Sequence, residues 1–235
     1  MSIKNAVKKK LNSGSRIDAE ALYKKIRDYN YVSFDIFDTL VKRNVEEPTD
    51  IYSIMEKFVG SGFRTKRIEA EKRARSELGK TEVTIEDIYS YFPKEDRRNL
   101  IDLELETEIK SIVPNLPLVE VYRKCLEAGK TVFITSDMYW TEDAVKMLLE
   151  RNGVTGYKTL YLSSSQQRVK SDGSLFKYLL EVEGLKPEQI VHIGDSRKGD
   201  CEEPNSVQVP LVASVKATSN TDSELNSWSR SKLSK

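Results

Sequence analysis

The sequence has few of the residues on which many metal and thiol sites depend. It contains a single histidine, His192, and two cysteines, Cys125 and Cys201, among its 235 residues. One histidine excludes most histidine-based metal sites and argues against a Ser-His-Asp triad; inside a predicted strand, it is expected to be a core residue. Two cysteines cannot form a disulfide framework, so we expect reduced thiols in a cytoplasmic protein.

Long apolar runs and an excess of one charge are also missing. No segment approaches the roughly 20 apolar residues of a membrane-spanning helix. The lysines near the N-terminus are not followed by the apolar stretch of a secretory signal. The 38 basic and 37 acidic residues nearly balance and form no obvious basic face of the kind that binds nucleic acid. We therefore expect neither a membrane nor a nucleic-acid partner.

The sequence does contain an alternation of short apolar runs with helical patterns. Runs rich in β-branched or aromatic residues predict buried strands at 31–37, 130–136, 157–163, 189–194 and 208–215. Apolar residues at helical spacing lie between most of them. Strands that alternate with helices predict βαβ units. We therefore expect an α/β fold with a parallel sheet.

One region interrupts this alternation. Between residues 45 and 113 there is no convincing strand, only helical patterns, such as the apolar residues spaced i, i+3, i+4 and i+7 from Ile51. We therefore expect an α/β core at 15–44 and 114–213 and an inserted all-helical subdomain at 45–113. The ends, 1–14 and 214–235, are expected to be flexible. The Ser-rich C-terminal end allows the chain to be a module of, or a partner to, a larger protein.

Polar side chains follow four of the predicted strands, in the order Asp35, Asp38, Ser136, Asp137, Lys170, Asp195 and Asp200. In a parallel sheet, ligands bind at the carboxyl ends of the strands, so we expect these groups to meet at one rim. Carboxylates without histidine or thiolate suit a hard cation such as Mg²⁺. A lysine and a hydroxyl beside that cation suit a phosphoryl group.

These four segments resemble the four motifs of the haloacid dehalogenase (HAD) superfamily, in the same order and on the same elements. They contain FDIFDTL, TSDMY, RVK and GDSRKGD, and the resemblance covers about residues 30–213. The resemblance implies a three-layer sandwich with a parallel, five-stranded, Rossmann-like sheet, whose strands, numbered along the chain, stand in the order 5-4-1-2-3. The helical insert lies where that family places its cap. FDIFDTL, SDMY and the last loop also resemble a subgroup of HAD domains found with bacterial surface-polysaccharide genes.

The resemblance implies roles for the first two motifs. Asp35 resembles the nucleophile that attacks phosphorus and forms an aspartyl-phosphate, because Thr39 stands four residues after it. Asp38 as nucleophile would have no threonine at that offset. Ser136 resembles the hydroxyl that bonds a phosphate oxygen, and Thr135 is the neighbouring alternative.

The resemblance also implies roles for the last two motifs. Lys170 resembles the lysine that neutralises the nucleophile and the phosphoryl group, with Arg168 as its rival. Asp195 resembles the metal ligand, and Asp200 the second acid that holds metal-bound water or the lysine. The backbone carbonyl of Phe37 would complete the coordination of Mg²⁺, together with the nucleophile.

The first motif departs from the family at one position. HAD phosphatases carry a second aspartate two residues after the nucleophile as general acid and base, where this chain has Phe37, which cannot transfer a proton. Three outcomes stay open: Asp38 substitutes, the site works slowly, or it binds a phosphorylated ligand without turnover. A dehalogenase also lacks that aspartate but needs no metal, so Asp195 and Asp200 favour a phosphate site.

We therefore expect a Mg²⁺-dependent hydrolase of the phosphatase type, acting on a small phosphorylated metabolite. The alternative is a non-catalytic HAD-like module that binds a phosphorylated ligand or a protein partner; dehalogenation is a third option. Arg64 or Arg67 reaches the mouth of the site, or both lie on a solvated helix face. The residues expected to bind substrate are Thr39, Arg43, Thr135 and Asp137.

Overall fold

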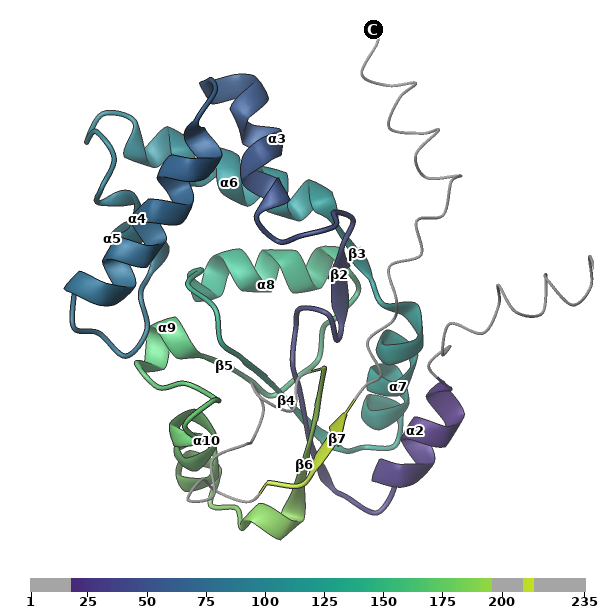
Figure 1. Cartoon of the computed structure of the whole chain (residues 1–235). Coiled ribbons are helices and arrows are strands. Elements are labelled where there is room, and N and C mark those ends of the chain that lie inside the picture. Colours follow the sequence, from purple (N-terminus) through teal and green to yellow (C-terminus); the bar gives the residue numbers. More distant parts are fainter. Residues whose placement is uncertain (1–17, 196–208, 214–235) are drawn as a thin grey trace, which may run out of the picture.

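The computed structural model describes residues 18–195 and 209–213. Its centre is a parallel sheet in the order β5-β4-β1-β6-β7 (Figure 1). The strands are β1 (Tyr31–Phe34), β4 (Thr131–Ser136), β5 (Thr159–Leu162), β6 (Ile190–Gly194) and β7 (Leu211–Ala213). The predicted α/β class, the parallel sheet and the order of its strands are confirmed.

The central strand, β1, sets the position of the predicted site. Phe34 at its end lies beside Ile134 of β4 on one side and Ile193 of β6 on the other. The carboxyl ends of these three strands therefore meet at one edge. The apolar residues of β1 are fully buried, as expected for a parallel strand that is covered on both faces.

Helices cover both faces of this sheet. On one face, α2 (Ala19–Ile26), α7 (Leu116–Glu127) and α8 (Glu142–Arg151) contribute to the larger apolar cluster. On the other face lies α10 (Ser174–Glu183), where Phe176 packs edge-on against His192 with ring centroids 4.9 Å apart. This arrangement gives three layers, and the expectation that His192 is a core residue is confirmed.

Local sequence explains where several helices begin. The Asp18 side chain accepts a hydrogen bond from the amide of Ala21, and Thr141 accepts one from Ala144, so each caps the helix that follows.

The inward face of α7 includes Cys125, where burial raises the thiol pKa to about 12. Cys125 is therefore protonated and inert; Cys201 lies outside the described residues.

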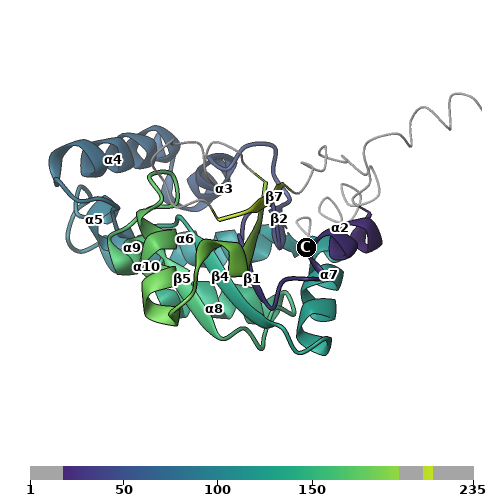
Figure 2. The same ribbon diagram turned by 90° about the horizontal axis from the view of Figure 1, so that it is seen from below.

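The insert consists of α3 (Asp50–Val59), α4 (Phe63–Glu77), α5 (Ile85–Tyr89) and α6 (Arg97–Ser111). In α5, Thr84 and Asp87 form a capping box. Figure 2 shows α4 and α5 at one end of the molecule and α2 and α7 at the other. One continuous apolar cluster joins the insert to the sheet.

A two-stranded antiparallel ribbon leads into and out of the insert. It consists of β2 (Val41–Arg43) and β3 (Ile112–Pro114). Sequence analysis found no convincing strand between residues 45 and 113, and β3 corrects this at its edge. Three residues are too few to show the alternation that marks a strand. Within the described residues, the insert adds no strand to the central sheet.

Two short elements complete the described chain: α9 (Ser163–Gln166) follows β5, and the 3-10 turn η1 (Pro187–Gln189) precedes β6. No described helix is both long enough and apolar enough to cross a bilayer. The predicted flexible ends, 1–14 and 214–235, lie outside the described residues.

Candidate active site at the carboxyl edge of the sheet

Three of the predicted catalytic side chains meet at the edge of the sheet. The Lys170 ammonium group lies 2.8 Å from Asp35 Oδ1. The Ser136 hydroxyl donates a 3.0 Å hydrogen bond to the same oxygen. All three residues are buried, and Asp35 is only 6% exposed. Burying a carboxylate is costly unless a cation and hydrogen-bond donors replace its solvation, and this cluster supplies both.

The fold explains why residues so distant in sequence come together. Asp35 follows β1 directly and donates its amide to the carbonyl of Ile193 in β6 at 2.9 Å. Ser136 is the last residue of β4, which neighbours β1. Lys170 comes from the loop between α9 and α10. Asp35 and Ser136 are thus positioned by the ends of neighbouring strands, and Lys170 is positioned by the loop between α9 and α10.

Asp137 ties two of these segments to each other. Its carboxylate oxygens accept the amide hydrogen of Lys170 at 2.9 and 3.1 Å. Burial raises the pKa of Asp137 to about 6, although the nearby Lys170 opposes this shift. The expected contact of Asp137 with substrate is untested, but the structure places it in direct contact with the lysine loop.

The oxygen atoms at this edge suit a hard divalent cation. Asp195 lies two residues beyond Ile193, the residue whose carbonyl binds the amide of Asp35. Two acidic residues therefore follow adjacent strands. Within the described part of the chain, Asp35 Oδ1 accepts both hydrogen bonds and Oδ2 accepts none. The carbonyl of Phe37 follows in the same turn. This set of oxygen donors fits Mg²⁺.

The proposed metal ligands are only partly described. Asp200 lies outside the described residues, so its predicted role is neither supported nor excluded. Among residues 18–195 and 209–213, no three acidic, histidine or cysteine side chains form a group able to hold a metal. Asp35 and Asp195 follow adjacent strands, and their role as metal ligands stays a prediction.

The position of the missing general acid is covered by a cation. The Arg43 guanidinium group lies 4.0 Å from the centre of the Phe37 ring. Its Nε donates a 2.7 Å hydrogen bond to Glu108, a buried carboxylate of α6. The expected substrate contact of Arg43 is untested, and its contacts in the structure are with Phe37 and the insert.

Asp38, the possible substitute acid, is exposed and adopts a left-handed backbone conformation with φ of 56°. Aspartate tolerates this conformation better than most residues. Lys42 lies near enough for Asp38 to raise its pKa, although burial lowers that pKa more strongly. No described group makes a hydrogen bond with the Asp38 side chain, so nothing aligns it with Asp35.

Two predicted substrate ligands lie in the interior. The Thr135 hydroxyl is 2.7 Å from that of Ser33, which is 2.9 Å from Nδ1 of His192. This polar chain joins three neighbouring strands, and it engages Thr135 away from the Asp35 cluster. The Thr39 hydroxyl is buried without a hydrogen-bond partner among the described residues, and its carbonyl accepts one from Asn115. Of the two candidate hydroxyls, Ser136 is the one that contacts Asp35.

Three arginines considered from sequence lie elsewhere. Arg168 bonds the carbonyl of Gln166 and stacks on Tyr178, so Lys170, not its rival, contacts Asp35. Arg64 bonds Thr49 within the insert. Arg67 is fully buried in an ion pair with Glu104, which rules out a solvated position and corrects the expectation of a basic solvated face.

Sequence reasoning missed a set of residues that join the insert to the site loops. Glu82 of the insert accepts hydrogen bonds from Ser163 and Gln167, beside the segments that carry Ser136 and Lys170. Nothing local marks these residues: Glu82 stands in a polar loop, and Ser163 and Gln167 flank a short serine-rich segment.

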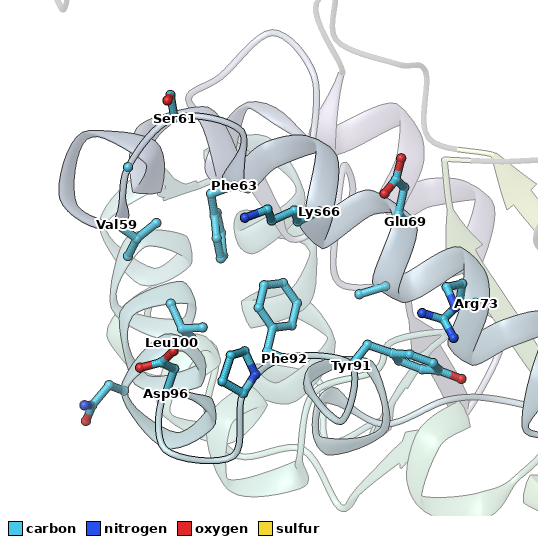
Figure 3. Close-up of a pocket in the computed structure, with 14 residues that line it drawn as sticks. Val59, Ser61, Phe63, Lys66, Glu69, Arg73, Tyr91, Phe92, Asp96 and Leu100 are labelled. Carbon is cyan, nitrogen blue, oxygen red and sulfur yellow. The ribbon is translucent and has the colours of Figure 1, made fainter.

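A hollow in the described structure lies elsewhere, within the insert. It has a volume of about 690 Å³ and is bounded by α4, the end of α3 and the α5–α6 junction. Figure 3 shows Phe63 and Phe92 in its wall, with Lys66 and Asp96 nearby. None of its lining residues is a predicted site residue, so the candidate site does not coincide with this hollow.

Comparisons with known proteins identify the fold. No family model and no curated protein matches the sequence. Among solved structures, a HAD family enzyme from Bacteroides thetaiotaomicron in complex with magnesium and inorganic phosphate has a TM-score of 0.55 at 12% identity, covering 81% of this chain and 96% of that one.

Two further solved structures agree. A HAD phosphatase from Thermococcus onnurineus has a TM-score of 0.53 at 18% identity, covering 82% of this chain and 87% of that one. A putative haloacid dehalogenase-like hydrolase from Bacteroides fragilis has a TM-score of 0.53 at 16% identity, covering 85% and 93%. The chain therefore has the fold of HAD-family enzymes, as the four motifs implied.

Proposed function

We propose that the protein is a Mg²⁺-dependent hydrolase of the phosphatase type that acts on a small phosphorylated metabolite. The observation that carries this proposal is the buried cluster of Asp35, Ser136 and Lys170 at the carboxyl edge of a HAD-like sheet. It combines a nucleophile, a hydroxyl donor and a cation, which are the groups that phosphoryl transfer requires. The helical insert acts as the cap.

In the first step, Asp35 attacks the phosphorus of a phosphate monoester. A bond forms between a carboxylate oxygen and phosphorus while the bond to the leaving oxygen breaks, and the leaving group departs with the electron pair. In the second step, water attacks the phosphorus of the aspartyl-phosphate, which releases inorganic phosphate and restores Asp35. Lys170 and Ser136 hold the carboxylate and bind the phosphoryl oxygens.

A divalent cation would be held by Asp35, Asp195 and the Phe37 carbonyl, with Asp200 as a further ligand. When bound, it would neutralise the negative charge of the phosphoryl group. The Asp35 amide, fixed by the carbonyl of Ile193, keeps the first carboxylate beside the loop of the second. The chain itself thus sets the spacing of the two acids.

The leaving group receives its proton from solvent, because Phe37 cannot donate one. We therefore expect the enzyme to favour leaving groups of low pKa, such as aryl phosphates, over alkyl phosphates. The same feature supports a second candidate, a module that binds a phosphorylated ligand without turnover, since Arg43 covers the ring where the acid would stand.

The test is phosphate release from a panel of phosphate monoesters, with MgCl₂ or with EDTA. Release that depends on Mg²⁺ and is lost in Asp35→Asn, but kept in the matched control Asp38→Asn, supports the proposal. Loss in Asp38→Asn without a loss of stability identifies Asp38 as the substitute acid. Phosphate binding by calorimetry without turnover of any ester assigns the protein to the non-catalytic class.

A further inference from the structure

Glu82, in the insert loop between α4 and α5, bonds residues at both ends of α9, on the segment that leads to Lys170. The Ser163 hydroxyl lies 3.2 Å from Glu82 Oε2 and donates to it. The same hydroxyl accepts the amide of Met138 at 2.8 Å. Met138 lies two residues beyond Ser136. The Ser163 hydroxyl therefore joins the Glu82 carboxylate to the segment that follows Ser136.

The second connection runs through Gln167. Its side-chain amide donates to the carbonyl of Glu82 and to that of Ser164, each at 2.9 Å. Gln167 itself has φ of 51°, a left-handed conformation that is uncommon outside glycine and needs local support. Lys170 follows three residues later, so Glu82 also bonds the turn from which the lysine loop begins.

These bonds close a ring around the site. The loop that carries Lys170 is also bonded to the segment that follows Ser136, because the amide of Lys170 donates to the Asp137 carboxylate. Glu82 is thus the member of this ring that comes from the insert; it bonds Gln167 directly and reaches Met138 through Ser163. Removing it would leave the two segments joined only to each other.

The carboxylate of Glu82 is costly to bury, which argues that its position matters. Glu82 is 5% exposed. Its other oxygen accepts hydrogen bonds from Arg75 at 2.5 Å and from the amide of Val83 at 2.9 Å. A surface that only had to pack against the core would use an apolar residue, because desolvating a carboxylate is costly even when it is paired.

We propose that Glu82 is a positioning residue: through Ser163 and Gln167 it holds the segments of Ser136 and Lys170 at the spacing that Asp35 requires. This inference rests on the proposed function. It makes the insert part of the catalytic framework, although Glu82 itself touches neither substrate nor reacting atoms. A small displacement of positioned groups is enough to lower a rate by about 10²-fold.

The experiment compares five proteins: wild type, Glu82→Leu, Glu82→Gln, Ser163→Ala and the matched control Glu77→Gln. Glu77 is an exposed carboxylate that pairs with Arg73 at the end of α4. Each is assayed with p-nitrophenyl phosphate and Mg²⁺, and each is examined by amide hydrogen exchange at Met138 and Lys170. Ser163→Ala removes one hydroxyl and keeps the Glu82–Arg75 pair, so it serves where Glu82→Leu fails to fold.

We expect Glu82→Leu and Ser163→Ala to lower kcat about tenfold or more, with KM within about twofold, and to speed exchange at both amides while the control matches wild type. Glu82→Gln, which keeps an acceptor for Ser163, should restore most of the rate. Unchanged kcat and unchanged exchange in a folded variant overturn the inference. Faster exchange with no hydrolysis by wild type refutes the proposed function instead and leaves the positioning role standing.

Discussion

Two buried ion pairs, one in the insert and one at the sheet edge, differ in how completely their atoms are used. In the insert, Nε and Nη2 of Arg67 bind both oxygens of Glu104 at 2.7 and 2.9 Å, and Nη1 binds Glu71 at 3.0 Å. At the sheet edge, Lys170 and Ser136 both bind Oδ1 of Asp35. Oδ2 accepts no hydrogen bond from any described residue.

Aromatic rings close off the pair in the insert. The rings of Tyr52, Tyr89 and Tyr139 lie 4.7, 5.4 and 5.1 Å from the Arg67 guanidinium group. The hydroxyls of Tyr89 and Tyr139 donate to Glu104 at 2.5 and 3.1 Å. Burial and the nearby Glu104 raise the pKa of Tyr89 above its usual value, so the hydroxyl keeps its proton.

The difference shows how a buried charge can serve structure or chemistry. Each nitrogen of the Arg67 side chain donates to a carboxylate and three rings pack around it, so the insert pair stabilises packing. Asp35 keeps one oxygen for phosphorus or a cation. A buried ion pair with unused atoms at the end of a strand is therefore the better candidate for catalysis.

The largest effect on activity is expected from Asp35→Asn. It removes the nucleophile, so hydrolysis should fall by about 10³-fold or more, while the folded state loses only one charged partner of Lys170. The measurement is the release of phosphate with Mg²⁺, alongside urea unfolding of the same sample. Activity within tenfold of wild type would contradict the role assigned to Asp35.

The largest effect on stability is expected from Arg67→Met. It leaves the Glu104 carboxylate buried without its cation, which should cost about 3–5 kcal/mol of unfolding free energy. Chemical denaturation measures this loss, and Arg73→Met is the control because its ion pair with Glu77 is exposed. Equal stability of the two variants would show that the buried Arg67–Glu104 pair contributes no more to the unfolding free energy than an exposed ion pair does.

A smaller effect on stability is expected from Asp137→Asn. Its pKa is about 6 in the folded protein, against an ordinary value of 3.8, so the folded state binds the proton more tightly than the unfolded chain. The contribution of this proton to the unfolding free energy is fully present below about pH 4. As the pH rises through 6, about 1–3 kcal/mol of it is lost.

Asp137→Asn should therefore gain stability relative to wild type as the pH is raised from 4 to 7. Unfolding free energies at several pH values measure the difference, and Asp28→Asn, at an exposed aspartate, serves as the control. A constant difference between wild type and Asp137→Asn over this range would contradict the raised pKa.

The smallest effect is expected from Phe37→Asp, which adds a carboxylate beside the open ion pair. With a group able to protonate the leaving oxygen, turnover of alkyl phosphates should rise about tenfold, at the lower end of what general acids contribute. Aryl phosphates should change less because they need less protonation. The ratio of the two rates is the measurement, and an unchanged ratio would mean that the new carboxylate pairs with Arg43.

The sequence pattern indicated the residues of the ion pair at the sheet edge. Asp35, Ser136 and Lys170 each stand just after a strand or in the next loop, and the carboxyl ends of parallel strands converge. The strands were also predictable, because each is an apolar run bounded by polar segments, and the resemblance to the HAD superfamily implied their order. The contact of Lys170, not Arg168, with Asp35 required the structure, since two residues in one loop have no periodicity to separate them.

Nothing in the sequence pattern indicated the buried Arg67–Glu104 ion pair of the insert. The α4 segment carries many charges, so Arg67 has the pattern of a solvated helix face. Its burial depends on Glu104 and Tyr139, which come from elements far along the chain. Glu82 was missed for the same reason: its partners are about 80 residues away. Tertiary pairing of charges leaves no local mark in sequence.

The central place of β1 sets the timing of assembly during synthesis. Its first residue, Tyr31, pairs with Thr131 on one side and Ile190 on the other (Figure 1). At roughly 5–20 residues per second, the strand leaves the ribosome several seconds before its first neighbour. Helices α3 to α6 are made in that interval and have local partners at once. The middle of the sheet, by contrast, is made early and waits with both edges open to chaperones or to other nascent chains.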